Sequence, residues 1–298
     1  MDIQVPDDVT TYIKRHFSIC NDNLSTDLSS FPAMHEPTLD MSFISYFSRH
    51  QAPVRLPSNW VVSIDSNFIG GGRHYDRWEV ADLGLLMIFR RRGKVIRSKL
   101  AMLQSKKIYA AQAKHTEGPR YGLGSFLVSE AEHADLVKET TLKFKETSRY
   151  QAFAKNDDQQ TTMGHFERRW GMSLHYLFYN PLDIPLSVAV PMRGEPSFPS
   201  NSVGCRVVPK KVLDQALKDK PIGYKPSYAD LQNGIPRTLN EIECAAGWRM
   251  EGFAADLMLQ CKEGFVDDSP NFESVAIIFD QKRLPMSAGI AITFDIPD

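Results

Sequence analysis

Two apolar runs joined by a short polar turn, within residues 79–107, constrain this chain more than any other part of the sequence. Leu83 to Phe89 is almost wholly apolar, Arg90 to Lys94 is polar with Gly93 as the turn residue, and Val95 to Leu103 is a second run with apolar residues at alternate positions near its end. Runs of this length and spacing are typical of two adjacent antiparallel strands. We therefore expect a β-hairpin with buried strands.

Polar side chains lie at the open end of this hairpin. Asp82 enters the first strand, and Gln104 and Lys106 leave the second. Because side chains alternate along a strand, Gln104 and Lys106 share one face and Ser105 points to the other. Two neighbouring strands then bring Asp82, Gln104 and Lys106 to the same end of a sheet.

This set of side chains suits the hydrolysis of a phosphodiester. A hard cation such as Mg²⁺ binds oxygen ligands, neutralises charge on the phosphate and activates a water. Asp82 supplies a carboxylate, Gln104 an amide oxygen and the backbone carbonyl of Ser105 a third oxygen, while Glu79 adds a second negative charge. Lys106 beside them would orient the water or stabilise charge on the phosphate oxygens.

The order acid, strand, turn, strand, Gln-x-Lys resembles the PD-(D/E)xK nuclease superfamily, in the Gln-x-Lys branch that includes restriction-like and anti-phage effector nucleases. Asp82 matches the motif aspartate, and Gln104 and Lys106 match the Gln-x-Lys pair. Ala81 stands where the motif proline is usual. The similarity covers roughly residues 36–110.

The resemblance implies an α/β fold with a restriction-endonuclease-like mixed sheet flanked by helices. It implies Mg²⁺ or Mn²⁺ as cofactor, with Glu79, Asp82 and Gln104 as metal ligands and Lys106 as catalytic base or charge stabiliser. The family usually has another acid on a helix ahead of the first core strand, for which Glu36 and Glu79 compete. The resemblance also implies DNA as substrate, a role in anti-phage defence, an ATPase, helicase or sensor subunit as partner, and a homo-oligomer.

A local basic patch accompanies the candidate site, although the formal net charge of the chain is -1. A phosphate backbone is expected to lie against such a patch. The bland alternative for residues 90–94 is a solvated hairpin tip. The basic residues fall within 18 positions that contain no acid: Arg90, Arg91, Arg92, Lys94, Arg97, Lys99, Lys106 and Lys107.

Three other interpretations stay open. Acids before a strand can solvate a loop or cap a helix, and Gln-Ser-Lys-Lys can be an ordinary polar strand end. A subunit without catalytic activity could bind nucleic acid or protein through residues 90–107. The same metal chemistry also serves an RNA-directed nuclease, because only groove shape distinguishes the two substrates.

The cysteines and the N-terminal residues favour a cytoplasmic protein. Cys20, Cys205, Cys244 and Cys261 have no C-x-x-C spacing, which argues against a zinc site or a disulfide framework. The first 17 residues lack the basic and apolar regions of a signal peptide, and no apolar run is long enough to cross a bilayer. We expect no membrane partner.

The remaining pattern predicts one elaborated domain over residues 1–298, with a nuclease core at about 36–146 and a C-terminal α/β extension at about 165–298. Residues 20–38 and 191–204 are expected to be irregular connections, and Gly70 to Gly72 a flexible turn. The expected helices are 7–17, 39–50, 129–146, 150–170, 210–217 and 240–261, and the further strands are 60–68, 174–180, 205–208, 274–280 and 288–295.

Overall fold

The computed structural model describes residues 3–68, 80–111, 140–190, 192, 197–236, 246–268 and 286–298. Its helices are α1 (Asp7–Ser30), α2 (Glu36–Ser48), α4 (Asp158–Trp170), α5 (Lys210–Ala216), α6 (Tyr228–Gly234), α7 (Met250–Gly252) and the π-helix η3 (Phe253–Met258). Its strands are β1 (Val54–Arg55), β2 (Val61–Phe68), β3 (Ala81–Arg91), β4 (Lys94–Lys107), β5 (Thr140–Phe144), β6 (His175–Tyr179), β7 (Leu186–Val190), β8 (Arg206–Pro209), β9 (Trp248–Arg249), β10 (Phe265–Asp267) and β11 (Met286–Ile296).

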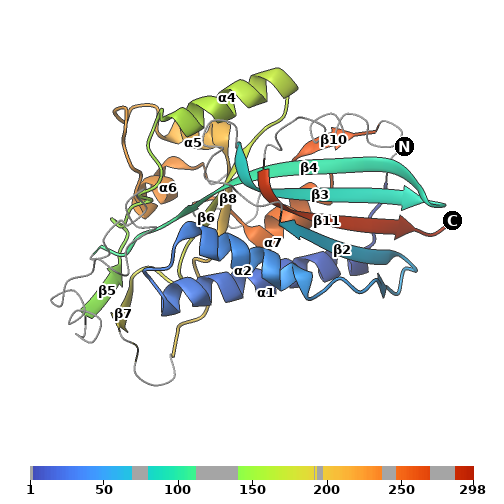
Figure 1. The fold of residues 1–298 in the computed structure, drawn as a ribbon, viewed down its shortest axis with the longest axis horizontal. Coiled ribbons are helices and arrows are strands. Elements are labelled where there is room, and N and C mark those ends of the chain that lie inside the picture. The colour runs from blue at the N-terminus through green and yellow to red at the C-terminus, as the bar shows by residue number, and fades with distance from the viewer. Residues whose placement is uncertain are drawn as a thin grey trace, which may run out of the picture.

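A mixed sheet organises the described part of the chain (Figure 1). Its strand order is β1-β2-β11-β3-β4-β6-β8-β9, with β10 added beside β4. The hairpin β3–β4 lies at the middle of this order. Strand β11 comes from the C-terminal end and pairs parallel to β3 and antiparallel to β2. Strand β6 pairs parallel to the last residues of β4. Residues from both ends of the sequence therefore build one sheet.

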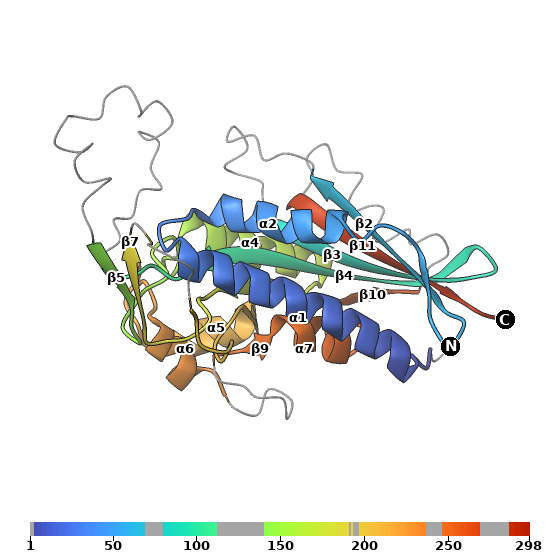
Figure 2. The ribbon, with the colours of Figure 1, turned by 90° about the horizontal axis from the view of Figure 1, so that it is seen from below.

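Helices cover the sheet on both sides. In Figure 1, α1 and α2 lie on one side of the hairpin strands and α4 lies on the other. Figure 2 shows α1 and α2 running side by side along the molecule. The chain is thus a mixed α/β protein, as the sequence predicts.

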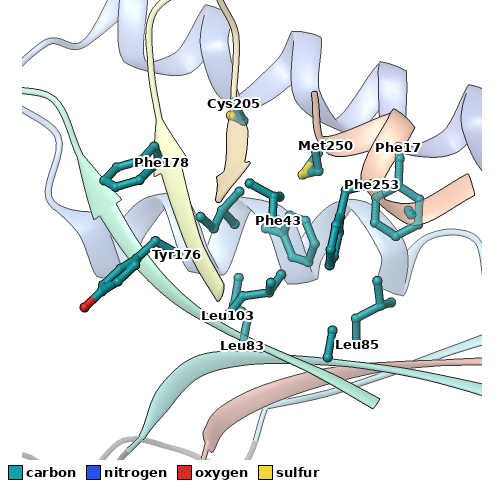
Figure 3. Close-up of a cluster of buried hydrophobic side chains, with 14 of the residues drawn as sticks. Phe17, Phe43, Leu83, Leu85, Leu103, Tyr176, Phe178, Cys205, Met250 and Phe253 are labelled. Carbon is teal, nitrogen blue, oxygen red and sulfur yellow. The ribbon is translucent and has the colours of Figure 1, made fainter. Parts of the chain in front are cut away.

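Apolar side chains from several layers meet under α2. Phe43 of α2 lies at the centre of the cluster in Figure 3, with Phe17 of α1 and Phe253 of the π-helix nearby. Leu83 and Leu85 of β3 face the same cluster (Figure 3), and all five side chains are at least 98% buried. Burying a Leu or Phe side chain stabilises a fold by about 1.5–3 kcal/mol. This packing holds α2 against the start of β3, which matters for the site described below.

The structure confirms the hairpin, the helix at 39–50 and the strands at 60–68, 174–180 and 288–295, with ends that agree to within four residues. The strand at 205–208, running into a helix at 210–217, is also confirmed. The first helix is longer than predicted, since it continues to Ser30. Its buried Ser29 hydroxyl donates to the carbonyl of Ser25, so this polar segment satisfies its groups inside the helix.

Three predicted helices need correction. Residues 140–144 of the helix at 129–146 form strand β5, which pairs with β7. The helix at 150–170 begins only at Asp158. In the helix at 240–261, Ala246 and Gly247 have positive φ angles, and Trp248 to Arg249 is a strand that precedes a short helical segment. A positive φ is incompatible with a right-handed helix, so the helix cannot pass that point.

Several sequence predictions lie outside the described residues. These are the role of Glu79, the turn at Gly70 to Gly72, the helical segment 129–139, the strand at 274–280 and the environment of Cys244. Within the described ranges, no helix combines the length and the apolar character needed to cross a membrane.

Candidate metal centre

Strand β4 runs past the beginning of β3, and this overhang creates the candidate site. The last register pair between the two strands is Leu83 with Leu103, so residues 105–107 of β4 have no β3 partner. Two carboxylates take the place of that missing strand. The amide N–H of Ser105 donates to Oδ2 of Asp82 at 2.7 Å, and that of Lys107 donates to Oε1 of Glu36 at 2.7 Å.

Asp82 and Gln104 are brought together, as the hairpin pattern predicts. Gln104 Nε2 donates to Oδ2 of Asp82, and the hydroxyl of Ser105 lies 2.8 Å from the same oxygen. The other carboxylate oxygen of Asp82 has no hydrogen-bond donor among the described residues. One oxygen of Asp82 is therefore held in place, and the other remains open for a ligand.

Helix α2 also supplies the carboxylate of Asp40, which was not predicted from the sequence. Asp40 lies one turn after Glu36, and its Oδ2 is 3.0 Å from the Ser105 hydroxyl. Its Oδ1 accepts a hydrogen bond of 2.7 Å from the hydroxyl of Tyr179 on β6. Spacing of i and i+4 places Glu36 and Asp40 on one helix face, a signal that could have indicated both acids.

Asp40 and Asp82 share one hydrogen-bond donor, the hydroxyl of Ser105. The single hydroxyl hydrogen of Ser105 can be donated to Asp40 or to Asp82, but not to both. Burial raises the pKa of Asp40 well above its usual range, and the nearby charge of Asp82 raises it further. A positive charge between the two acids would relieve this repulsion.

Gln104 adds a buried oxygen without a partner. The side chain is 2% exposed, and its Oε1 accepts no hydrogen bond from the described residues. Leaving a buried acceptor unpaired costs about 1–3 kcal/mol. A cation would satisfy this oxygen directly. Rotation of the amide would also place Oε1 toward Asp82, an arrangement that is favourable only if a cation lies between them.

The donor set fits a hard divalent ion through oxygen atoms alone. It consists of the carboxylates of Asp40 and Asp82 and the amide oxygen of Gln104. Within the described ranges, no group of three or more His, Cys, Asp and Glu side chains is placed to hold a metal. The candidate centre therefore depends on Gln104 as its third ligand.

Lys106 follows Ser105 on β4 and is 5% exposed. Its Nζ is 3.9 Å from Oε2 of Glu36, so the same carboxylate holds both the backbone of β4 and this ammonium group. Lys107 has a different environment. Its Nζ donates to the carbonyl of Met34 and lies 4.2 Å from the centre of the Tyr109 ring. We predicted that Lys107 contacts nucleic acid. At 1% exposure its side chain is buried within the protein, so this prediction is wrong.

The basic hairpin tip is not beside this centre, contrary to our expectation. Register pairs run from Leu83–Leu103 to Arg91–Lys94, and eight steps of about 3.3 Å put the tip roughly 26 Å away. A further correction concerns Lys99, which is buried and donates to the carbonyls of Met258 and Glu263.

Acids from distant segments neutralise part of the tip. Arg90 pairs with Asp295 at 3.2 Å and Arg92 with Asp298 at 2.8 Å. The side chain of Arg97 makes two hydrogen bonds to Asp268. Binding of nucleic acid by Arg90, Arg91, Arg92, Lys94 and Arg97 remains a prediction, now for a surface separate from the metal centre.

Comparison with protein-family models, curated proteins and solved structures finds no match to this chain. The arguments for function therefore depend on the geometry of Asp82, Gln104, Asp40 and Lys106.

Proposed function

We propose that this protein is a Mg²⁺- or Mn²⁺-dependent endonuclease that hydrolyses DNA phosphodiester bonds. The observation that carries the proposal is the contact of the Gln104 side-chain amide with the Asp82 carboxylate at the end of the β3–β4 hairpin, where Oε1 of the same amide is buried and accepts no hydrogen bond from the described residues. With the amide rotated so that Oε1 faces Asp82, the carboxylate and the amide oxygen would form an oxygen donor set of the kind that hard cations prefer.

The order of elements supports a restriction-endonuclease-like core. Helix α2 precedes the first long strand, the hairpin β3–β4 carries the acid and the Gln-x-Lys sequence, and β6 returns parallel to β4 after a connection that contains α4. Asp40 and Glu36 on α2 are both candidates for the additional helix acid that the resemblance implies. We favour Asp40 as the metal ligand, because an oxygen of Asp40 and an oxygen of Asp82 both lie within 3.0 Å of the Ser105 hydroxyl, whereas Glu36 accepts from the amide of Lys107.

A cation bound by these oxygens would neutralise charge on the scissile phosphate and activate a water. The protein's own residues do the rest. Asp82 and Asp40 orient their oxygens through Ser105, and Tyr179 holds Asp40. Lys106, restrained by Glu36, places an ammonium group at the same end of the sheet, where it would stabilise charge on the phosphate oxygens.

The experiment is to incubate the purified protein with supercoiled plasmid, linear duplex and single-stranded RNA in Mg²⁺ or Mn²⁺, and to repeat it in chelator. Cleavage of DNA that disappears in Asp82→Ala and Lys106→Ala supports the proposal. Cleavage of RNA alone would favour the RNA-directed alternative. Inert wild-type protein that binds no divalent cation would favour a binding subunit without catalytic activity.

A further inference from the structure

A second polar cavity lies on the α4 side of the sheet, between α4, the start of α5 and the turn that precedes α4. Its volume is about 310 Å³. This is at the lower end of the range for small-molecule sites, about 300 to 1,000 Å³. Three cationic side chains and one acid line it, together with neutral residues. The lining residues are Lys155, Asn156, Gln160, Thr161, Gly164, Arg168, Lys210 and Asp214.

The acid in this cavity is already neutralised. One oxygen of Asp214 accepts from Lys210 Nζ at 2.6 Å, and the other accepts from the side-chain amide of Gln160. Glu167, nearby, accepts the backbone N–H of Leu174 at 2.9 Å and has its other oxygen 3.8 Å from Lys210. Lys210, 7% exposed, therefore uses its charge within the protein.

The other two cations have no such partner. Lys155 Nζ donates to the carbonyls of Lys218 and Lys220, and a guanidinium nitrogen of Arg168 lies 3.0 Å from Nδ1 of His165. Neither forms an ion pair with a carboxylate in the described part of the chain. The lining therefore carries three cations against one acid, and the two cations without a carboxylate partner lie on separate elements.

Gly164 keeps the space open between the basic groups. A Cβ at this position would lie 3.6 Å from a guanidinium nitrogen of Arg168 and 3.7 Å from Lys210 Nζ. The absence of a side chain at Gly164 thus leaves the guanidinium group of Arg168 accessible from the cavity. Thr161 and Asn156 line the same space.

From this arrangement we propose that the cavity binds a phosphate group. The guanidinium fork of Arg168 matches the geometry of phosphate oxygens, and Lys155 adds a second charge. Thr161 and Asn156 supply neutral donors. The phosphate has two possible sources, a free phosphate compound or the backbone of a nucleic acid. The inference does not depend on the metal centre, since the cavity uses none of its residues.

The chain offers a matched pair of variants on one helix. Arg168→Glu removes a cavity cation, whereas Arg169→Glu makes the same charge change at a residue that stacks on Trp170 and does not line the cavity. Gly164→Leu is a third variant, which fills the space without changing charge. Circular dichroism establishes that each variant is folded.

Two titrations in chelator, without divalent metal, distinguish the sources. Pyrophosphate is followed by calorimetry and a short DNA duplex by fluorescence anisotropy. We expect Arg168→Glu to weaken the binding of one of these ligands by about tenfold or more, the effect of losing one charge-assisted hydrogen bond. Gly164→Leu should weaken the same ligand by filling its space, while Arg169→Glu stays near wild type. Loss of pyrophosphate binding identifies a free phosphate compound, and loss for the duplex alone identifies the nucleic-acid backbone. Equal behaviour of Arg168→Glu and Arg169→Glu with both ligands, or no binding of either by wild type, would overturn the proposal whether or not the protein is a nuclease.

Discussion

Replacing Asp40 by Asn should change stability in opposite directions with and without a divalent cation. Oxygens of Asp40 and Asp82 both lie within 3.0 Å of the Ser105 hydroxyl, which puts them less than about 6 Å apart. Two unit charges at that separation repel by about 3 kcal/mol at an effective dielectric constant of about 20. Asp40→Asn also loses one hydrogen bond from Tyr179 or Ser105, which offsets about 1 kcal/mol of the relieved repulsion. In chelator, Asp40→Asn should therefore raise the free energy of unfolding by about 2 kcal/mol once both acids are ionised.

The gain should depend on pH with a definite sign. Burial and the charge of Asp82 raise the pKa of Asp40 above its ordinary value of 3.8, so the folded protein binds a proton more tightly than the unfolded chain. Stability from this group is then fully present below pH 3.8 and is lost as the pH rises through the raised pKa. The difference between Asp40→Asn and wild type should grow across the same interval.

The assay is urea unfolding of wild type, Asp40→Asn and the control Asp65→Asn, an exposed acid on β2, at several pH values in chelator and in millimolar Mg²⁺. With Mg²⁺, wild type should gain stability from binding, and Asp40→Asn should gain so much less that it becomes the less stable of the two proteins. The reasoning is refuted if Asp40→Asn destabilises the protein equally in both solutions, or if its effect matches that of Asp65→Asn.

Three further predictions concern Glu36, Lys99 and Arg92. Glu36→Ala should lower the free energy of unfolding by about 1–3 kcal/mol, because the buried amide of Lys107 loses its acceptor. Calorimetry should find the Mn²⁺ affinity of this variant unchanged, and a loss of affinity would make Glu36 a ligand. Burial lowers the pKa of Lys99 to about 8, so the stability of wild type relative to Lys99→Met should rise as the pH increases from 8 toward 10.5 in urea titrations; a flat difference would contradict the buried charge. Arg92→Ala should cost less than about 1 kcal/mol in thermal unfolding, since its pair with Asp298 is exposed, and a larger loss would show that the tip is structural.

The hairpin and its polar end were predictable from local pattern alone. The apolar runs predicted both strands, and the two-residue alternation predicted that the side chains of Gln104 and Ser105 point to different faces of the sheet. A β-hairpin is a local structure, so its register brings Asp82 and Gln104 together without help from the rest of the chain. This is why the centre of the site could be inferred from fewer than 30 residues.

Contacts between segments that are distant in the sequence could not be predicted from local pattern. The stretch containing Arg90, Arg92 and Arg97 has no acid in sequence, yet Asp295, Asp298 and Asp268 neutralise it in space. The place of β11 between β2 and β3 is likewise a long-range pairing.

Asp40 was missed for a related reason. Its partners are Ser105 and Tyr179, from two strands far along the chain. The i, i+4 spacing from Glu36 was visible in the sequence, but nothing local indicated that this helix face meets the end of β4. A helix acid gains meaning only when packing of α2 against the sheet is known.

Anomalous diffraction from crystals of the protein soaked in Mn²⁺ would locate the cation directly. We expect one strong peak at the open end of the hairpin, bonded to a carboxylate oxygen of Asp82 and to Oε1 of Gln104, with Asp40 in the same coordination shell. Density showing Gln104 still donating to Asp82, with no manganese between them, would contradict this expectation.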